Sequence, residues 1–527
     1  MLLLSINTLL VFILNSVDLC KINFIMKVNK LFFLSLFSFL LISCSQDDEK
    51  ISFTILQVND VYEIAAIQND QYGGMARVET VRQELLANDK NTMLVIAGDF
   101  LNPSLVGTMK YEGKKISGRQ MVEVMNAMDF EVAAFGNHEF DVKEHELQNR
   151  MNESEFPWIS ANVFNVKEKD TLAFHQEING VQQEIKGSYI KEITDDDGTK
   201  IKIGFISVCI PSNPKSFVHY TDMYESIQEE YNRIKDEVDV VLGLTHVKVD
   251  QDEKIAELLP NIPLIMGGHE HTKKDRRVGD VIIRKADANA KSAYIHTISF
   301  DKNTKASTVS SVLKVIDTTV AYDLKVKNIV DKWQNIMDQE ISQVVENPYE
   351  VIYTTGVPLD GRDTPIRSTQ TNLGEIVTKS MAFSYDNKVD CSIVNGGSIR
   401  IDDELIGDIN SVDIFRVLPY GGSVLKVQMK GSLLYETLKF GENASGSGAY
   451  LQRDNVEYEN NVWKVNGKKI DPSKTYTVAI SDFLLKGFDI PFLTPENKGV
   501  VSIYTPKETE MAFDIRKGVI AYMKTLD

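Results

Sequence analysis

Cysteine is scarce in this chain, with four residues among 527. No two of them have the spacing of a zinc finger. Two fall within the first 50 residues, and the other two, Cys209 and Cys391, lie inside apolar, strand-like stretches. We therefore expect Cys209 and Cys391 to be buried free thiols rather than a disulfide. This pattern argues against a disulfide framework and against a cysteine-based zinc site.

Positive charge is also in short supply. The 57 lysine and arginine residues are outnumbered by 75 acidic residues, which gives a formal net charge of −18. Such a surface repels a polyanion, so we expect no nucleic acid partner. A small anionic substrate is compatible with this charge, because a few local cations can hold it. Nothing in the sequence indicates a protein partner.

The chain has little hydrophobic sequence of membrane-spanning length. Near its start, residues 31–42 form an apolar stretch behind Lys27 and Lys30. That stretch is about half as long as the ~20 residues that a transmembrane helix needs. A basic start, a short apolar stretch and a small residue before a cleavage point are typical of a secretory signal.

Residues 41–44, Leu-Ile-Ser-Cys, resemble the bacterial lipobox, in which the cysteine receives a lipid and becomes the first residue. This resemblance implies a lipoprotein signal peptide over 1–43, with Met26 as a candidate true start, and a linker over 44–50. The mature protein would be extracytoplasmic and anchored to a membrane through Cys44. A serine after the cysteine favours the outer membrane, on its periplasmic or outer face.

Two α/β domains are expected after the leader. From residue 51 to about 300, apolar stretches of strand length alternate with helical patterns, as in sheets covered on both faces. We predict one domain over 51–320, a linker helix over 321–345, and a second, smaller α/β domain over 346–527. The strands predicted in the first domain include 53–58, 92–98, 131–136, 202–208, 238–246 and 263–268.

Polar side chains recur where the predicted strands of the first domain end. Because ligands of an α/β sheet bind outside the carboxyl ends of its strands, we expect these side chains to meet at one edge. Carboxylate, amide and imidazole ligands suit Zn, Mn, Co, Mg or Fe, and a shared carboxylate would give a two-metal hydrolytic site. The residues concerned are Asp60, Asp99, Asn137, His138, His246, His269 and His271.

The motifs at these strand ends resemble those of the calcineurin-like metallophosphatases. They are Asn59-Asp60, GDFLNPS (98–104), GNHEFD (136–141), LTHVKVD (244–250) and GGHEH (267–271). The GNHEFD form and the second domain narrow the resemblance to the 5′-nucleotidase and UDP-sugar hydrolase family, over residues 51–527. The family implies a four-layer α/β-β/α metallophosphoesterase domain followed by a smaller α/β nucleotide-binding domain.

The resemblance also implies roles for single residues, with two divalent metal ions as cofactors. His138 and Asp141 match the catalytic dyad, in which the imidazole stabilises the transferring phosphoryl group and the carboxylate orients the imidazole. The implied metal ligands are Asp99 as the bridge, Asp60 and His271 at the first ion, and Asn137, His246 and His269 at the second.

The second domain carries motifs that resemble the nucleoside pocket of the same family. NGGSIR (395–400) matches the family signature. PYGG (419–422) has Gly422 where the family has asparagine, and DFLLKGFD (482–489) has Phe488 where the family has glycine. By this resemblance Tyr420 and Phe483 would sandwich the base. Arg367 and Arg400 would bind phosphate or ribose through forked hydrogen bonds, and Asp489 would accept from the ribose.

One position departs from the family at the metal site itself. The family has Asp-x-His-Gly where this chain has Asp60, Val61, Tyr62 and Glu63. Three interpretations are open. Tyr62 binds as a phenolate and favours a hard ion such as Fe³⁺, or Glu63 supplies a carboxylate, or the first site keeps only Asp60, Asp99, His271 and water. Since every other ligand is present, we expect an active variant of the site.

The resemblance implies hydrolysis of nucleoside phosphates by in-line attack of metal-bound hydroxide, in extracytoplasmic nucleotide salvage. A 2′,3′-cyclic nucleotide phosphodiesterase and a UDP-sugar hydrolase are alternatives on the same scaffold. A surface nucleotide-binding protein without catalysis is a third.

Overall fold

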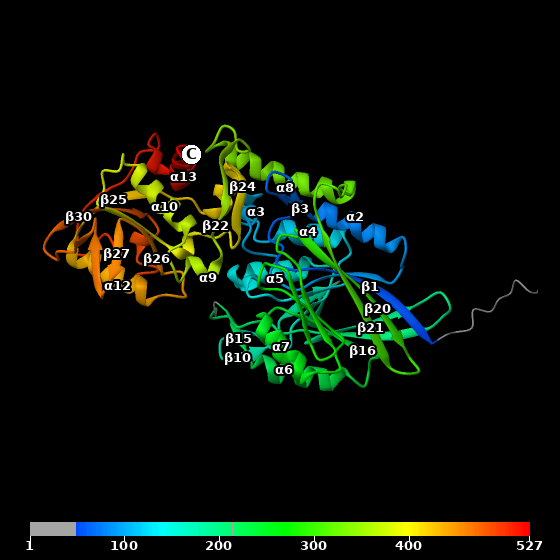
Figure 1. The fold of residues 1–527 in the computed structure, drawn as a ribbon. Coiled ribbons are helices and arrows are strands. Elements are labelled where there is room, and N and C mark those ends of the chain that lie inside the picture. The colour runs from blue at the N-terminus through cyan, green and yellow to red at the C-terminus, as the bar shows by residue number, and fades with distance from the viewer. Residues whose placement is uncertain (1–48, 179, 213–214, 527) are drawn as a thin grey trace, which may run out of the picture.

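The computed structural model describes residues 49–178, 180–212 and 215–526. The predicted signal peptide and Cys44 lie outside these residues. Figure 1 shows two domains side by side, the N-terminal one in blue to green and the C-terminal one in yellow to red. Within the described residues, no helix combines the length and the apolar character that crossing a membrane requires.

Two six-stranded sheets form the centre of the N-terminal domain. In the first, β1, β4, β7 and β8 are parallel. Strand β20 pairs antiparallel with β1, and β21 pairs antiparallel with β20. Its order is β21 (Ala306–Val315), β20 (Ser292–Asp301), β1 (Lys50–Val58), β4 (Thr92–Ile96), β7 (Val132–Ala134), β8 (Trp158–Ile159). The second sheet has the order β13 (Ser188–Thr194), β14 (Lys200–Ile206), β16 (Val240–Thr245), β17 (Leu264–Gly267), β19 (Val281–Lys285), β18 (Lys274–Val278).

The two sheets face each other across an apolar core. Phe53 and Val95 of the first sheet belong to the same buried cluster as Phe205, Leu242 and Met266 of the second. The outer faces are covered by helices, which explains why the strands are apolar on both sides. Helices α2 (Met75–Leu86) and α4 (Arg119–Ala127) cover the first sheet, and α6 (Met223–Ile234) and α7 (Val249–Leu258) cover the second. The expected four-layer α/β-β/α arrangement is confirmed.

The helix predicted over 321–345 is α8 (Leu324–Ser342). Its buried positions Val326, Val330, Trp333 and Met337 recur every three or four residues and form one face. That face packs against α2 and α4 of the N-terminal domain, and the Trp333 indole donates to Glu123 at 3.0 Å. The helix therefore belongs to the outer layer of the first domain, and the chain crosses to the second domain after it.

The C-terminal domain is built on a five-stranded mixed sheet. Its order is β26 (Leu451–Asp454), β23 (Cys391–Asn395), β30 (Thr475–Ser481), β25 (Val424–Lys430), β31 (Val500–Tyr504). Helices α10 (Asn372–Phe383), α12 (Gly431–Asn443) and α13 (Ile515–Met523) complete the domain. The antiparallel pair of β22 (Val351–Asp360) and β24 (Glu404–Asn410) stands next to the N-terminal domain.

The two cysteines among the described residues, Cys209 and Cys391, are buried and free, as predicted.

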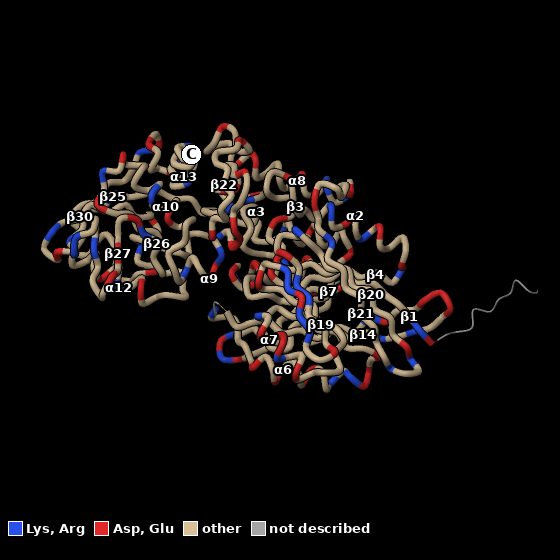
Figure 2. Tube along the Cα trace, in the orientation of Figure 1, with Lys and Arg blue, Asp and Glu red and all other residues tan. Residues whose placement is uncertain are grey.

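Acidic and basic residues are spread over both domains, and a basic group lies along β18 and β19 at the edge of the second sheet (Figure 2). Lys274, Arg276, Arg277 and Arg284 contribute to it.

One buried histidine lies outside the metal motifs. In β20, His296 Nε2 is 2.9 Å from Gln57 Oε1, and Nδ1 is 2.8 Å from Ser311 Oγ. Burial and, second, the positive charge of Arg284 lower the pKa of His296 to about 3. In the unfolded chain a histidine has a pKa of about 6.5. The neutral ring therefore stabilises the fold fully above about pH 6.5, and this stability is lost as the pH falls toward the folded pKa.

We expect His296→Gln to flatten the acid side of the stability curve. The glutamine keeps hydrogen-bonding capacity but does not titrate. Between about pH 6.5 and 4, the wild-type protein should lose up to about 1.4 kcal/mol of unfolding free energy per pH unit more than the variant. Urea unfolding at several pH values measures this difference. Equal slopes for wild type and variant would contradict the expectation, and exposed His219→Gln is the matched control.

Candidate metal and catalytic site

The predicted ligands converge from both sheets of the N-terminal domain. Asp60, Asp99 and Asn137 follow β1, β4 and β7 of the first sheet, while His246 and His269 follow β16 and β17 of the second. The sequence argument placed them at one edge without assigning each strand to a sheet. In the structure, the carboxyl ends of parallel strands from two facing sheets come together, which lets ligands approach from opposite sides.

The backbone at the site is held in unusual conformations. Asp60, Asp99, His269 and His271 have φ values of 53°, 57°, 93° and 58°, all in the left-handed region that non-glycine residues rarely adopt. Such conformations persist where the surrounding structure enforces them, and they gather at functional sites. Only glycine fits at position 136, because a Cβ atom there would lie 2.1 Å from Asp99 Oδ1.

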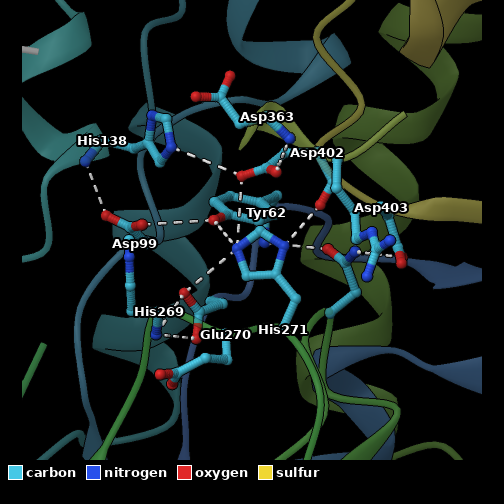
Figure 3. A network of polar contacts seen from close by, with 12 residues as sticks. Tyr62, Asp99, His138, His269, Glu270, His271, Asp363, Asp402 and Asp403 are labelled. Atoms are coloured by element: carbon cyan, nitrogen blue, oxygen red, sulfur yellow. Dashed lines mark hydrogen bonds and ion pairs between the residues drawn. The ribbon is translucent and has the colours of Figure 1, made fainter. Parts of the chain in front are cut away.

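The first group of ligand atoms surrounds the ring of His271 (Figure 3). Ligand atoms of Asp60, Asp99 and His271 all lie within 4.8 Å of one another, and all three residues are buried. The hydroxyl of Tyr62 joins them, at 2.8 Å from His271 Nε2 and 3.4 Å from Asp99 Oδ2. Two carboxylates, one imidazole and one phenol therefore lie close together, and this set of mainly oxygen ligands suits a hard cation.

The ligands predicted for the second ion are His246, Asn137 and His269, and the ring centroids of His246 and His269 lie 5.4 Å apart. His246 Nδ1 lies 2.7 Å from the carbonyl oxygen of Ala97, so Nδ1 donates, and Nε2 lies 3.0 Å from the carboxylate of Asp99. Asn137 Oδ1 is buried without a hydrogen-bond partner among the described residues. Buried polar atoms are rarely left unpaired. Asn137 Oδ1, the imidazole of His246 and the carboxylate of Asp99 are ligand types that suit a second cation.

Opposing charges set the ionisation of the cluster. Burial raises the pKa of Asp99, but the imidazoles of His246 and His138 outweigh it and lower the pKa to about 2. For His246, burial lowers the pKa, and the carboxylates of Asp99 and Asp60 raise it to about 9. Asp99 is therefore an anion between two imidazoles, as a bridging ligand requires.

Glu139 fixes the loop that carries Asp99. Its carboxylate accepts hydrogen bonds from the backbone amides of Gly136, Asp99, Phe100 and Leu101, at 2.6 to 3.1 Å. Burial and the charge of Asp99 raise the pKa of Glu139 to about 7. Glu139 thus ties the end of β4 to the end of β7.

The predicted dyad is present as a hydrogen-bonded pair. His138 Nδ1 lies 2.8 Å from Asp141 Oδ2. Asp141 also accepts from Arg400 of the C-terminal domain at 2.8 Å and pairs with Lys215 at 3.2 Å. Burial alone would raise the pKa of Asp141, but His138, Arg400 and Lys215 hold it well below its usual range. The carboxylate stays charged and orients the imidazole.

Tyr62 and Glu63 have different surroundings. The Glu63 carboxylate lies 3.5 Å from the guanidinium of Arg416 and accepts from the amide of Leu105 at 3.4 Å. It also lines a cavity of about 510 Å³ between α8 and the C-terminal domain. The Tyr62 hydroxyl, in contrast, faces His271 and Asp99. Of the three interpretations of this motif, the geometry favours Tyr62 as a ligand over Glu63.

The two aromatic residues predicted to bind the nucleoside line one pocket. Tyr420 and Phe483, together with Leu418, Ser398 and Ile515, border a cavity of about 350 Å³. The Phe483 ring packs against Phe488, at 5.6 Å between ring centroids. Both predicted aromatics are partly exposed, at 60% and 38%, which leaves their faces free for a base.

The polar residues predicted to bind the nucleoside contact other residues of the C-terminal domain or the dyad. The Asp489 carboxylate accepts a hydrogen bond at 2.7 Å from the side chain of Asn395, the first residue of the NGGSIR signature. Arg367 is buried and pairs with Asp363 at 2.6 Å. Arg400 contacts the dyad residue Asp141 and lines a small cavity with Tyr62 and with Pro419, the residue before Tyr420.

Sequence reasoning missed several residues that build this centre. Glu139 stands inside a recognised motif, but nothing in the sequence shows that it binds four amides. Asn289 accepts from the amide of Tyr62 at 3.1 Å and lies 227 positions away. Asp402 reaches the cluster from the other domain. Such contacts depend on tertiary structure and leave no local pattern.

Lys285 is another missed residue, and it supports the histidine loops. Its buried ammonium group donates to the carbonyl oxygens of Val247 and Gly268, next to His246 and His269. It also pairs with Asp252 at 2.8 Å and with Glu270 at 2.6 Å. One buried cation therefore fixes the chain at both second-site histidines.

We expect Lys285→Met to destabilise the protein by about 3–5 kcal/mol, because it leaves the Asp252 carboxylate buried without a counter-charge. Chemical denaturation measures the loss. Lys273→Met, at an exposed position of the same region, should change the stability little. An equal effect of both variants would contradict the role of Lys285.

Comparison with known families agrees with this geometry. The profile of the calcineurin-like phosphoesterases matches residues 53–273, and that of the 5′-nucleotidase C-terminal domain matches residues 351–494. The chain belongs to the 5′-nucleotidase family of metallophosphoesterases. It is therefore a phosphoesterase of the 5′-nucleotidase type, in a family that uses two divalent metal ions.

Relatives of this family resemble the chain over most of its length. A trifunctional nucleotide phosphoesterase of Bacillus subtilis is 26% identical over 83% of this chain, which spans 32% of that protein. The 5′-nucleotidase of Homo sapiens is 26% identical, with 83% of each chain covered. The structure of a 5′-nucleotidase precursor from Thermus thermophilus has a TM-score of 0.64 at 20% identity, covering 90% of this chain and 96% of that one. The structural likeness shows a shared fold.

Proposed function

We propose that this protein hydrolyses nucleoside 5′-monophosphates. The observation that supports this best is the position of Arg400, which contacts the dyad residue Asp141 and whose backbone amide donates to Val417, next to Leu418 in the lining of the Tyr420 and Phe483 pocket. A nucleoside whose base stacks between these aromatics would point its 5′ side toward the metal ligands. Stacking of this kind contributes about 1–3 kcal/mol per base and accepts any base.

We assign to the site residues the roles that the family resemblance implies. Bound ions would polarise the phosphoryl oxygens and lower the pKa of a water molecule. His138 stabilises charge on the transferring phosphoryl group and donates a proton to the leaving oxygen. Asp141 holds the imidazole, with Nδ1 toward the carboxylate and Nε2 toward the site. Arg400 neutralises Asp141 and, with Arg367, would bind phosphate or ribose, while Asp489 would accept from the ribose.

Three other functions are alternatives. Two are a 2′,3′-cyclic nucleotide phosphodiesterase and a UDP-sugar hydrolase on the same scaffold, and the third is a surface protein that binds nucleotides without hydrolysis. A sulfate thiohydrolase of Thermus thermophilus also shares the fold, with a TM-score of 0.58 at 12% identity. The aromatic pocket supports a nucleoside over a sulfur ester.

A substrate panel tests the proposal. The protein from residue 45 onward is stripped of metal and refilled with Zn²⁺, Mn²⁺, Co²⁺, Mg²⁺ or Fe in turn. Phosphate release is then measured from AMP, other nucleoside monophosphates, ADP, ATP, UDP-glucose and 2′,3′-cyclic AMP. We expect nucleoside monophosphates to give the highest kcat/KM, and chelation to abolish turnover. Faster hydrolysis of UDP-glucose or cyclic AMP would replace the proposal, and binding without turnover would favour the binding protein.

The domain boundaries and the cellular location complete the proposal. We infer a signal peptide over 1–43, a linker over 44–50, a catalytic domain over 51–320, the α8 region over 321–345 and a substrate domain over 346–527. The mature chain would be extracytoplasmic and lipid-anchored through Cys44, where nucleotide salvage supplies nucleosides and phosphate. Mass spectrometry of the mature protein, which identifies its first residue and any lipid on it, tests this location.

A further inference from the structure

A carboxylate of the C-terminal domain reaches the first group of metal ligands (Figure 3). Asp402 is buried, and its Oδ2 lies 3.4 Å from His271 Nε2 and 3.6 Å from His138 Nε2. Its other oxygen, Oδ1, accepts from the backbone amide of Asp363 at 2.6 Å. One carboxylate oxygen is thus fixed within the C-terminal domain, and the other faces the ligand cluster of the N-terminal domain.

Asp402 also orients the ring of His271. His271 Nδ1 lies 2.6 Å from the backbone carbonyl oxygen of Asp402. Since a carbonyl oxygen only accepts, Nδ1 carries the proton and Nε2 presents its lone pair. Metal-bound histidines are commonly fixed in this way, with the second ring nitrogen donating to a carbonyl or carboxylate. The same residue therefore places both the ring and a carboxylate.

The spacing of the oxygen atoms around His271 Nε2 fits a shared ion. Ligand atoms bound at about 2.1 Å from one cation lie about 2.8–3.5 Å apart. Tyr62 Oη is 2.8 Å from His271 Nε2, and Asp60 Oδ1 is 3.5 Å from it. Asp402 Oδ2, at 3.4 Å, has the same spacing as the predicted ligand Asp60.

We propose that Asp402 is a ligand of the first metal ion, supplied across the domain boundary at a centre where Tyr62 replaces the histidine of the family. Asp402 would then add a carboxylate beside the imidazole of His271, next to the group of Asp60, Asp99 and His271 whose ligand atoms lie within 4.8 Å of one another. Because the ligands come from both domains, binding of this ion stabilises their closed arrangement, and closure in turn tightens the ion.

The neighbouring residue provides a matched control. Asp403 is also buried and also links the two domains, through Lys291 at 3.0 Å and Asn289 at 3.4 Å. Its contacts are ion pairs and hydrogen bonds outside the ligand cluster. Asp403→Asn therefore weakens the domain boundary while leaving the proposed ligand in place, and Asp402→Asn removes the ligand charge while keeping the acceptor for the Asp363 amide.

The test is the affinity of the full mature chain for Mn²⁺, measured by the electron paramagnetic resonance signal of the free ion. We expect Asp402→Asn to raise the dissociation constant of Mn²⁺ at the first site by about 10-fold or more. Asp403→Asn should change this constant by less than about threefold. Small-angle scattering should show Mn²⁺ compacting the wild-type protein and the Asp403 variant, but not the Asp402 variant. Asp402→Ala, which also removes the Oδ1 acceptor, should match Asp402→Asn in affinity.

Unchanged Mn²⁺ affinity in Asp402→Asn would overturn the proposal and leave Asp402 as an ion-pair contact between domains. Equal losses in the Asp402 and Asp403 variants would overturn it too, because they would trace to a loosened boundary. The proposal rests on the metal centre and not on the choice of nucleotide. If the wild-type protein hydrolyses AMP and the Asp402→Asn variant binds Mn²⁺ with wild-type affinity, this inference is refuted and the proposed function stands.

Discussion

Replacing Asp99 by alanine is expected to lower the rate of phosphate release about a thousandfold or more, because we propose Asp99 as the ligand common to both ions. Its Oδ2 faces Tyr62 and His246, and its Oδ1 accepts from the His138 amide at 2.7 Å. Without it, both cations lose a carboxylate and the two imidazoles lose their shared anion. Metal analysis after dialysis should show at most one ion per chain in the variant.

Asp196→Ala is the control for this experiment. Asp196 is an exposed carboxylate that pairs with Lys90 far from the site, so its removal should leave rate and metal content unchanged. A wild-type rate in Asp99→Ala, or two retained ions, would refute the bridging role. An unfolding curve close to that of the wild type establishes that the lost activity is not lost folding.

His138→Ala should lower kcat by about 10²–10⁴ while both metal ions are retained. The imidazole is hydrogen-bonded to Asp141 and lies beside the ligand groups, and we do not place it among the metal ligands. The loss should depend on the leaving group. With a substrate that leaves as a stabilised anion, such as p-nitrophenyl phosphate, proton donation matters less and the variant should lose less activity.

His219→Ala, at an exposed histidine, is the matched control and should retain wild-type kcat. Loss of a metal ion in His138→Ala would move His138 from the dyad to the ligand set. An unchanged kcat would favour a protein that binds nucleotides without hydrolysing them.

Local sequence predicted the elements of the N-terminal domain well. The continuous apolar stretches at 53–58 and 238–246 form β1 and β16, because strands covered on both faces need apolar residues at every position. The polar residues that follow them could be predicted as ligands from their place at strand ends. What the pattern did not contain is that these strands belong to two different sheets.

Long-range contacts explain the rest of what was missed. Asp402 lies 131 positions from His271, and Lys285 lies 38 positions from Val247, so no sequence period links them. The surroundings of Tyr62 and Glu63 depend on partners from both domains, namely His271 and Arg416. Adjacent residues on one loop therefore serve different purposes that only the fold distinguishes.

We propose that this chain is a two-metal nucleotide phosphatase whose first site uses Tyr62 in place of a histidine. A direct test titrates metal-stripped protein with Mn²⁺ and records AMP hydrolysis at each ratio of metal to protein. We expect the rate to rise steeply and to reach its maximum at two equivalents. A full rate at one equivalent, or a rate independent of metal, would contradict it.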